Sequence, residues 1–317
     1  MSHDPVPIDN GFCGPLYGGS HEPTFAGAPS FMRRRFSKDI GQADVVVWGV
    51  PFDCATSNRP GARFGPAAIR RASAIFDGDP QYPSGRDPFA RMAVIDAGDC
   101  FFEYERLSIA PKLIEDQARQ IVAPKRQLVT LGGDHFVTLP LLRAHAAVHG
   151  RLALVQFDAH QDTWDDDGTK ISHGTFVTRA VAEGLIDVGR SVQVGVRTVA
   201  PHDYGIEILD MNQCAALGPA GVAARVKARV GPGPAYLTFD IDALDPAFAP
   251  GTGTPVAGGF TSAEALAILW RLAEIDFRGM DVVEVCPPYD HGEITAIAAS
   301  TIAQRYLQIL AQRRAAR

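Results

Sequence analysis

The chain has 317 residues, of which 46% are hydrophobic and 21% charged, with a formal net charge of −6 at pH 7. This composition is typical of a globular protein with a large core. The negative charge disfavours nucleic acid as a partner, because a phosphate backbone attracts a basic surface. No apolar stretch of about twenty residues and no signal peptide is found, so we expect no membrane partner. The five scattered cysteines include no CxxC pair, which predicts reduced thiols and a cytoplasmic protein.

The first part of the chain differs from the rest. Residues 1–44 are rich in Pro, Gly and Ser, which predicts an irregular N-terminal arm, either a partly ordered tail or a segment packed on a neighbouring subunit. From Asp44 the pattern becomes regular and no linker follows, so we expect a single domain over 45–317. Short apolar runs predict strands at 44–50, 92–96, 126–131, 151–157, 191–196, 235–241 and 281–286, and a short extended piece at 205–209. Helical patterns start at Pro66 and cover 107–122, 136–148, 176–183, 216–230, 263–275 and 294 to about 311.

Three of the predicted strands run directly into polar clusters: GGDH at 132–135, DAHQD at 158–162 and DID at 240–242. Strands that alternate with helices predict a parallel sheet. In open α/β sheets the binding crevice lies outside the carboxyl ends of the strands, so these clusters should converge. The structural alternative is a network of hydrogen bonds at the strand ends. Together the clusters supply six candidate metal ligands: His135, Asp158, His160, Asp162, Asp240 and Asp242.

The chemistry of this ligand set indicates which metal it would hold. Two divalent ions would neutralise the four aspartates, which lowers the cost of burying them. Carboxylates outnumber imidazoles and no cysteine takes part, which favours Mn²⁺, with zinc second and Mg²⁺ disfavoured by the two histidines. Two ions about 3.5–4 Å apart lower the pKa of a shared water and generate hydroxide. Because the ligand strands carry no Arg or Lys clamp for a phosphoryl group, we expect attack on a carbon centre.

Two residues outside the strand-end clusters can complete such a site. His173, in ISHGTF, could donate a proton to a leaving amine, or it could cap the start of a helix. Glu284, at the end of VVEV, could hold a cationic substrate group through paired hydrogen bonds, or it could be a salt-bridged carboxylate.

Taken together, these motifs resemble those of the ureohydrolases, the arginase and agmatinase family of dimanganese hydrolases. The resemblance is carried by GGDH, FDAHxD and the run TFDIDALDPAFAPGTGTP at 238–255. It extends from GVPFD at 49–53 to the C-terminal helix and so covers nearly the whole chain. Within the family the chain is most similar to bacterial agmatinases, in LGGDHFVTLPLLRAH, HGTF and GMDVVEVCPPYD.

The resemblance implies a three-layer α/β/α sandwich with a mostly parallel central sheet, assembled as a homotrimer or homohexamer. It also implies two Mn²⁺ ions per subunit, held by the six ligands named above. A hydroxide bridging the ions would attack the guanidinium carbon of agmatine, and the tetrahedral intermediate would collapse to putrescine and urea. Motif matching assigns catalysis to His173 as proton shuttle, Glu284 as guanidinium holder and Asp162. It assigns substrate binding to Glu284, Trp164 and His173.

Three positions depart from the agmatinase pattern, and they bear on substrate identity more than on reaction type. Gln161 is interpreted as facing away from the metals, and Cys286 as a small packed residue. Trp164 begins the loop that faces the substrate. The acidic run Asp165–Asp167 is either a solvated loop or a group of charges that attracts the distal amine of agmatine. On the second interpretation we expect agmatine to be preferred over guanidinobutyrate.

Other functions remain open at this point. A guanidinobutyrase or another guanidino-acid ureohydrolase would share the same metal site. A non-catalytic paralogue should have lost metal ligands, yet all six are present. A zinc deacetylase on a related fold would normally carry a pair of adjacent histidines, which this sequence lacks.

Overall fold

The computed structural model describes residues 14–19, 23–76 and 81–315. A nine-stranded sheet runs through the molecule, and all of its strand pairs are parallel, in the order β1-β3-β2-β4-β9-β8-β5-β6-β7. The predicted parallel sheet is therefore confirmed. In chain order the strands are β1 (Arg35–Phe36), β2 (Val45–Gly49), β3 (Val94–Asp99), β4 (Gln127–Leu131), β5 (Ala153–Phe157), β6 (Val192–Val196), β7 (Glu207–Asp210), β8 (Pro234–Asp240) and β9 (Asp276–Val283).

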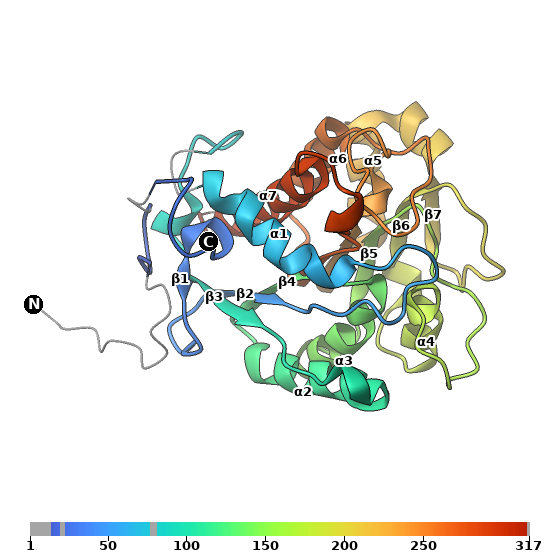
Figure 1. Ribbon diagram of the computed structural model, residues 1–317. Coiled ribbons are helices and arrows are strands. Elements are labelled where there is room, and N and C mark those ends of the chain that lie inside the picture. Colours follow the sequence, from blue (N-terminus) through green and yellow to red (C-terminus); the bar gives the residue numbers. More distant parts are fainter. Residues whose placement is uncertain (1–13, 20–22, 77–80, 316–317) are drawn as a thin grey trace, which may run out of the picture.

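Helices cover both faces of the sheet, which makes the molecule a three-layer α/β/α sandwich as predicted (Figure 1). Helices α1, α5, α6 and α7 lie on one face, and α2, α3 and α4 lie on the other. None of the described helices combines the length and apolar character needed to cross a bilayer. The helices are α1 (Gly65–Ala72), α2 (Ala110–Ile121), α3 (Thr138–His149), α4 (Phe176–Ala182), α5 (Met211–Val230), α6 (Ser262–Trp270) and α7 (Ile294–Ala315).

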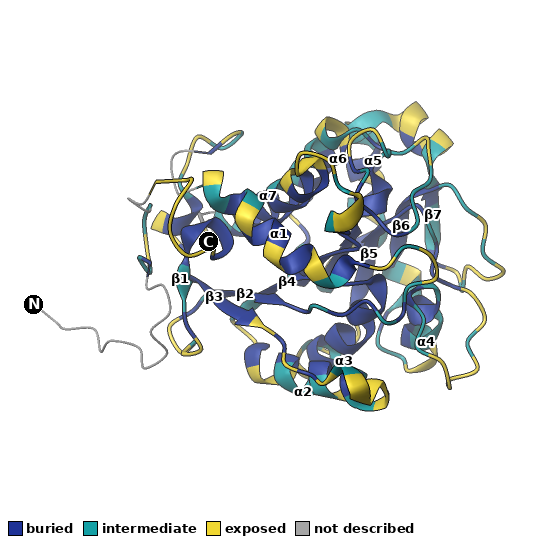
Figure 2. Ribbon diagram, viewed as in Figure 1, coloured by how far each residue is buried: buried dark blue, intermediate teal, exposed yellow. Residues whose placement is uncertain are grey.

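The sheet is buried on both sides, so each of its faces contributes to a separate core (Figure 2). Strand β2 shows the alternation: Val45 and Val47 pack in the core with α1, α5, α6 and α7, whereas Val46 and Trp48 pack in the core with α2, α3 and α4. Because successive side chains point to opposite faces, a strand covered on both sides is hydrophobic along its whole length. This explains why the strands are recognisable in the sequence as continuous apolar runs.

The N-terminal arm is more regular than expected in its second half. Phe31 and Met32 are fully buried, and Arg35–Phe36 forms strand β1, which pairs with Ile95 and Asp96 at the edge of the sheet. This part of the arm therefore packs on its own chain. Residues 1–13 and 20–22 lie outside the described residues, and the domain boundary at residue 44 stays a prediction.

Three predicted elements differ from the structure by five residues at one end. Helix α5 begins at Met211, five residues before the predicted start, because an Asp210–Gln213 capping box initiates it ahead of the break at Gly218. Helix α6 ends at Trp270, where residues 271–274 turn back toward the sheet. Strand β9 begins at Asp276 and ends at Val283, so Glu284 lies just beyond the strand.

A buried ion pair fixes helix α1 to the sheet. The guanidinium of Arg70 binds both carboxylate oxygens of Asp96 on β3, with Nε–Oδ2 at 2.8 Å and Nη2–Oδ1 at 3.0 Å. The same carboxylate accepts a hydrogen bond of 2.7 Å from the Phe31 amide. Asp96 therefore joins the sheet, α1 and the N-terminal arm, and α1 in turn anchors the preceding loop, which reaches the candidate site.

We expect Asp96→Asn to lower the free energy of unfolding by about 3–5 kcal/mol, because it removes the buried counter-charge of Arg70 and leaves that guanidinium only the partly exposed carboxylate of Asp99. The matched control is Glu293→Gln, which breaks an exposed pair with Arg71 on the same helix and should cost about 0–1 kcal/mol. Urea unfolding followed by circular dichroism measures both. Equal losses in the two variants would contradict this role for Asp96.

Candidate metal centre and active site

The candidate site lies where four adjacent strands end. Strands β4, β9, β8 and β5 are neighbours in that order, and their carboxyl ends lie at one edge of the sheet. Asp240 is the last residue of β8, Asp158 directly follows β5, and Glu284 directly follows β9. His135 comes four residues after β4. The predicted convergence of the clusters GGDH, DAHQD and DID is thus confirmed by the sheet order.

The GGDH turn aims His135 at this edge. A side chain at Gly133 would approach the Phe52 carbonyl oxygen to 1.6 Å, so only glycine fits there. The Asp134 amide donates to that same carbonyl at 2.7 Å, and the Asp134 carboxylate accepts from the Phe136 and Ala55 amides at 3.1 and 2.7 Å. Asp134 therefore supports the turn as a helix cap, and it is not one of the facing ligands.

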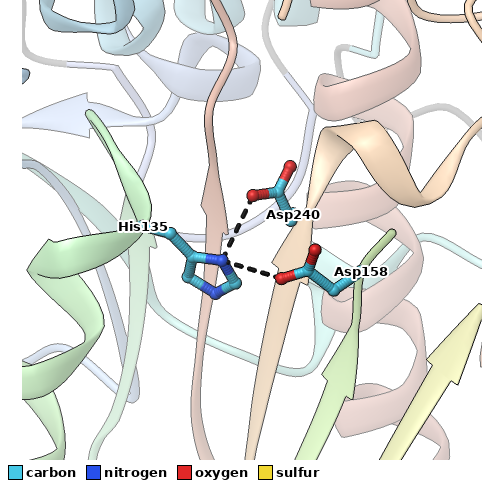
Figure 3. A group of neighbouring side chains, drawn as sticks. All are labelled: His135, Asp158 and Asp240. Atoms are coloured by element: carbon cyan, nitrogen blue, oxygen red, sulfur yellow. Dashed lines mark ion pairs between the residues drawn. The ribbon is translucent and has the colours of Figure 1, made fainter. Parts of the chain in front are cut away.

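A first group of ligands surrounds one nitrogen of His135 (Figure 3). Its Nδ1 lies 3.0 Å from Asp158 Oδ2, 3.0 Å from Asp162 Oδ2 and 3.1 Å from Asp240 Oδ2. All four side chains are buried, and Nδ1 has no hydrogen-bond partner within the described part of the chain. A nitrogen facing three carboxylate oxygens is the arrangement expected around a bound cation.

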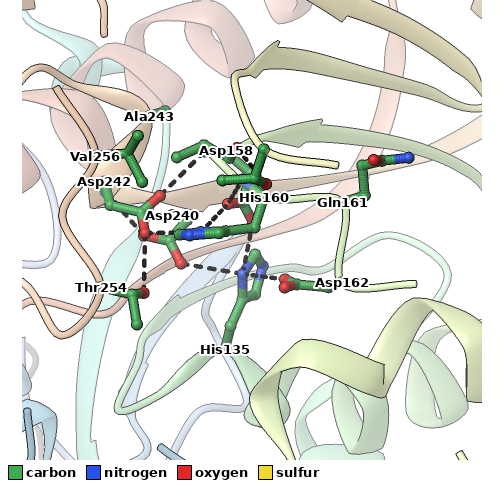
Figure 4. A network of polar contacts seen from close by, with 12 residues as sticks. His135, Asp158, His160, Gln161, Asp162, Asp240, Asp242, Ala243, Thr254 and Val256 are labelled. Carbon is green, nitrogen blue, oxygen red and sulfur yellow. Dashed lines mark hydrogen bonds and ion pairs between the residues drawn. The ribbon is translucent and has the colours of Figure 1, made fainter. Parts of the chain in front are cut away.

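A second group shares Asp158 with the first (Figure 4). His160 Nδ1 lies 3.3 Å from Asp158 Oδ1 and 3.1 Å from Asp242 Oδ2. Asp242 is held in place by the Ala159 amide at 3.1 Å and by the Thr254 hydroxyl at 3.2 Å. Each carboxylate oxygen of Asp158 thus faces a different imidazole, so this residue can bridge two adjacent ions.

The charges of the cluster fit divalent cations. Burial raises the pKa of Asp240 well above its usual range, and the charges of Asp242 and Asp158 raise it further. Burial and the neighbouring Asp158 raise the pKa of Asp162 to about 6. Burial lowers the pKa of His160, but the hydrogen bonds and charges of Asp158 and Asp242 outweigh it and raise that pKa to about 12. Protons therefore offset part of the crowded negative charge, and divalent ions can replace them. Because Nδ1 of His135 faces three carboxylate oxygens and the donor set is rich in oxygen, these residues fit a two-ion site of a hard metal such as Mn²⁺.

Two residues of the site hold left-handed backbone angles that side chains other than glycine rarely adopt. Asp162 has φ 53° and Glu284 has φ 63°. Such angles persist only where surrounding contacts enforce them, and they concentrate at functional sites. Here the Asp162 carbonyl accepts from the Val177 amide at 3.2 Å, and the Glu284 amide donates to Gly133 at 2.8 Å. Both carboxylates are thereby turned toward the strand ends.

His173 and Glu284 form a pair beside the ligand groups. His173 Nδ1 lies 2.8 Å from Glu284 Oε1, and the Ser57 amide donates to Nε2 at 3.1 Å when the ring is neutral. Burial lowers the pKa of His173, but the hydrogen bond and charge of Glu284 outweigh it and raise that pKa to about 9. The ring can therefore take up and release a proton, as a proton shuttle requires.

Only one of the two carboxylate oxygens of Glu284 accepts a hydrogen bond from the described residues. Its Oε1 accepts from the His135 amide at 2.8 Å as well as from His173. Its Oε2 is buried, has no hydrogen-bond partner among the described residues, and lies close to Gly253, where a Cβ would approach it to 3.0 Å. A buried carboxylate oxygen without a donor is suited to a cationic group brought in by a substrate.

A pocket of about 660 Å³ opens onto these groups. His135, His160, Asp162, Asp240 and His173 line it, whereas Asp158, Asp242 and Glu284 lie behind that lining. Trp164, 37% exposed, forms part of the wall, as expected for the start of the loop that faces the substrate. The pocket thus brings together the predicted ligands, the predicted proton shuttle and a predicted substrate contact.

The predicted acidic run lines the outer part of this pocket, but its three carboxylates are not equivalent. Asp166 is bound by both ends of the Arg179 guanidinium, at 2.6 and 2.7 Å. Asp165 is largely exposed and binds His202 at 2.8 Å. Asp167 accepts hydrogen bonds from Thr169 in its own turn. With Lys170 also in the lining, the three carboxylates face two permanent cations, which leaves an excess of one negative charge.

Sequence reasoning missed several residues of the site. Ser57 and Thr254 line the pocket, and the hydroxyl of Ser57 lies 2.8 Å from His173 Nε2. The nearest signals in the sequence are RPGARFGP at 59–66, which follows Ser57, and GTGTP at 251–255, which contains Thr254. Neither a serine nor a threonine stands out in a loop. Gln156 also went unnoticed: its side-chain amide donates to Asp158 Oδ2 at 2.8 Å.

The two other departures from the expected pattern agree with their interpretation. Gln161 points away from the ligand groups and accepts from the Ala200 amide at 2.8 Å (Figure 4). Cys286 is fully buried, and its thiol donates to the Pro60 carbonyl at 3.2 Å. Neither residue faces the metal centre.

Comparison with known proteins places this site in a family. Residues 43–308 match the model of the arginase family. An agmatinase of Chromobacterium violaceum is 49% identical over 304 residues, which cover 95% of this chain and 94% of that protein. The crystal structure of a hypothetical agmatinase from Burkholderia thailandensis superposes with a TM-score of 0.93 at 50% identity and covers 95% of this chain and 96% of that one. The proclavaminate amidino hydrolase of Streptomyces clavuligerus superposes with a TM-score of 0.87 at 39% identity and covers 92% of this chain and all of that one.

The shared position of Asp158 leads to a test of metal stoichiometry. We expect the wild-type protein to bind about two Mn²⁺ per chain and Asp158→Asn to bind fewer than one. The variant His160→Asn should keep about one Mn²⁺, because His160 belongs to the second group alone. Elemental analysis of gel-filtered protein measures the content.

The matched control is Gln161→Ala, which changes the neighbour of His160 in the same loop but leaves every facing ligand in place. It should retain both ions. If Asp158→Asn also retained both, Asp158 would not bridge the two groups.

Proposed function

Because the chain belongs to the arginase family, we propose that it is a binuclear manganese hydrolase that cleaves agmatine to putrescine and urea. The observation that carries the proposal is one pocket in which two carboxylate–imidazole groups lie beside Glu284, a buried carboxylate with a free oxygen. Nearly half of the residues are shared with a relative named agmatinase, over almost the full length of both chains, which supports agmatine as the substrate.

The metal ligands are the six predicted residues: His135, Asp158, His160, Asp162, Asp240 and Asp242. When bound, two Mn²⁺ ions would supply the nucleophile by lowering the pKa of a water molecule. The contribution of the chain is to hold the ligands at fixed positions on the ends of rigid strands and to exclude bulk water from the buried carboxylates.

Glu284 orients the substrate. Its free Oε2 accepts hydrogen bonds from the guanidinium N–H groups, while the bond from the His135 amide to Oε1 keeps the carboxylate fixed next to the ligand groups. A guanidinium held there presents its central carbon toward the ligands at the end of the neighbouring strands.

His173 moves the proton that the leaving amine needs. Its raised pKa, caused by Glu284, lets the ring take up a proton at neutral pH, and its place in the pocket lining gives that proton a path to the departing nitrogen. Ser57 touches the Nε2 atom of this ring and fixes its orientation.

The outer part of the pocket selects the far end of the substrate. The net negative charge contributed by Asp165–Asp167 attracts the distal amine of agmatine and repels a carboxylate. Trp164 packs beside the carbon atoms of the substrate that link its guanidinium to its distal amine.

A second candidate is hydrolysis of a guanidino acid such as guanidinobutyrate. Lys170 in the pocket lining favours it, and the similarity to a protein named proclavaminate amidino hydrolase supports a substrate other than agmatine. A non-catalytic role is disfavoured because all six ligands face one another.

Two further properties complete the proposal. The four described cysteines, Cys54, Cys100, Cys214 and Cys286, are free thiols, which suits a cytoplasmic protein. We propose a homotrimeric or homohexameric assembly on the basis of the family resemblance.

The charge of the outer pocket gives the first test. With Mn²⁺ loaded, kcat/KM for agmatine should exceed that for guanidinobutyrate at least tenfold, a difference of about 1.4 kcal/mol in transition-state binding. Urea release from a panel of guanidino compounds measures it. A preference for the acid would refute the assignment of agmatine.

The second test concerns Glu284. Substitution Glu284→Gln should lower kcat/KM for agmatine about 10- to 100-fold, because a charge-assisted hydrogen bond to the guanidinium is lost. Mn²⁺ content should stay unchanged, since Glu284 is not among the ligands. The matched control, Cys286→Ser, alters a buried residue two positions away and should retain activity. A Glu284→Gln variant with the kcat/KM of the wild-type protein would contradict the proposed binding of the guanidinium by Glu284.

A further inference from the structure

The second ring nitrogen of His135 points away from the ligand groups and into the core. Its Nε2 lies 2.8 Å from the hydroxyl of Thr238, a fully buried residue of β8. A neutral imidazole carries one proton, on one nitrogen or the other. If Nδ1 is to offer a lone pair to a metal ion, the proton must be on Nε2, and Nε2 must then donate to Thr238.

The hydroxyl of Thr238 donates its hydrogen to a carboxylate and not to His135. Its oxygen lies 2.5 Å from Oδ1 of Asp281 on β9, the residue directly opposite Thr238 in the strand register. In this contact the Thr238 hydroxyl donates and the carboxylate oxygen of Asp281 accepts. Toward His135, the Thr238 oxygen can therefore only accept.

Asp281 is surrounded by donors. Its Oδ2 accepts from the Tyr236 hydroxyl at 2.8 Å and from the Thr138 hydroxyl at 3.0 Å. The side chain is fully buried and does not line the pocket. All three hydroxyl neighbours thus direct their hydrogens at this carboxylate, which fixes the direction of every hydrogen bond in the chain that leads to His135.

We propose that Asp281, acting through the Thr238 hydroxyl, is a positioning residue that holds His135 in the tautomer with Nδ1 free to bind a metal ion. The proposal rests on the proposed metal site. A carboxylate that serves only to stabilise the core would have no reason to control the proton on His135, so metal affinity separates the two roles.

The sharpest variant is Asp281→Asn. Tyr236 and Thr138 still donate to the amide oxygen, which places the NH₂ group against Thr238. The amide then donates to the Thr238 oxygen, the freed hydroxyl hydrogen points at Nε2, and the imidazole proton is driven to Nδ1. We expect the Kd for Mn²⁺ to rise about 10- to 100-fold, as for other outer partners of metal-binding histidines.

A pair of identical substitutions provides the control. Thr130 on β4 and Thr238 on β8 flank Asp281 in register on either side, but the Thr130 hydroxyl has no hydrogen-bond partner among the described residues. Thr238→Val should weaken Mn²⁺ binding as strongly as Asp281→Asn, and Thr130→Val should leave the Kd within about twofold. Thr238→Ser, which keeps the hydroxyl, should restore it.

Equilibrium dialysis of the full-length variants against Mn²⁺ measures the Kd, and the melting temperature of the metal-free protein reports folding. Should Asp281→Asn fail to fold, the three threonine variants decide. Folded Asp281→Asn or Thr238→Val with wild-type Mn²⁺ affinity would overturn the proposal. A wild-type protein that binds no Mn²⁺ would instead refute the metal site itself.

Discussion

The constraint on which the structure depends is the burial of four aspartates within reach of two imidazoles. An unpaired charge in a protein interior costs several kcal/mol even after relaxation, and these carboxylates lie close enough to repel one another. Such a cluster of carboxylates is stable in a packed core only when protons or cations offset its negative charge. The raised pKa values of Asp240 and Asp162, and the carboxylate oxygens that surround Nδ1 of His135, are consequences of this one arrangement.

The sheet makes the arrangement possible. Parallel strands end at the same edge, so ligands from β4, β5 and β8 meet although about a hundred residues separate the first from the last. Backbone hydrogen bonds at that edge hold Asp162 and Glu284 in their left-handed angles. The loop that carries Trp164 and Asp165–Asp167 lines the same pocket but contributes none of the facing ligands. In the proposed function, recognition of the far end of the substrate therefore depends on a different part of the chain from the metal ligands.

The sequence was informative where chemistry and periodicity coincide. His135, Asp158 and Asp240 could be assigned because each follows an apolar run that is recognisable as a buried strand. The pairing of Asp166 with Arg179 and the contact between Ser57 and His173 could not, because they join loops whose paths no local pattern specifies. The link from His135 through Thr238 to Asp281 was also hidden, since it depends on the register between β8 and β9. The start of α5 at Met211 was also not predicted, because Gly218 and Pro219 interrupt the helical pattern after the capping box.

The central claim is that two metal ions occupy the two ligand groups that share Asp158. Anomalous diffraction at the manganese absorption edge, from crystals of the Mn²⁺-loaded protein, tests it most directly. Two peaks are expected, one among His135, Asp158 and Asp240 and one among Asp158, His160 and Asp242. A single peak, or peaks away from these residues, would contradict it.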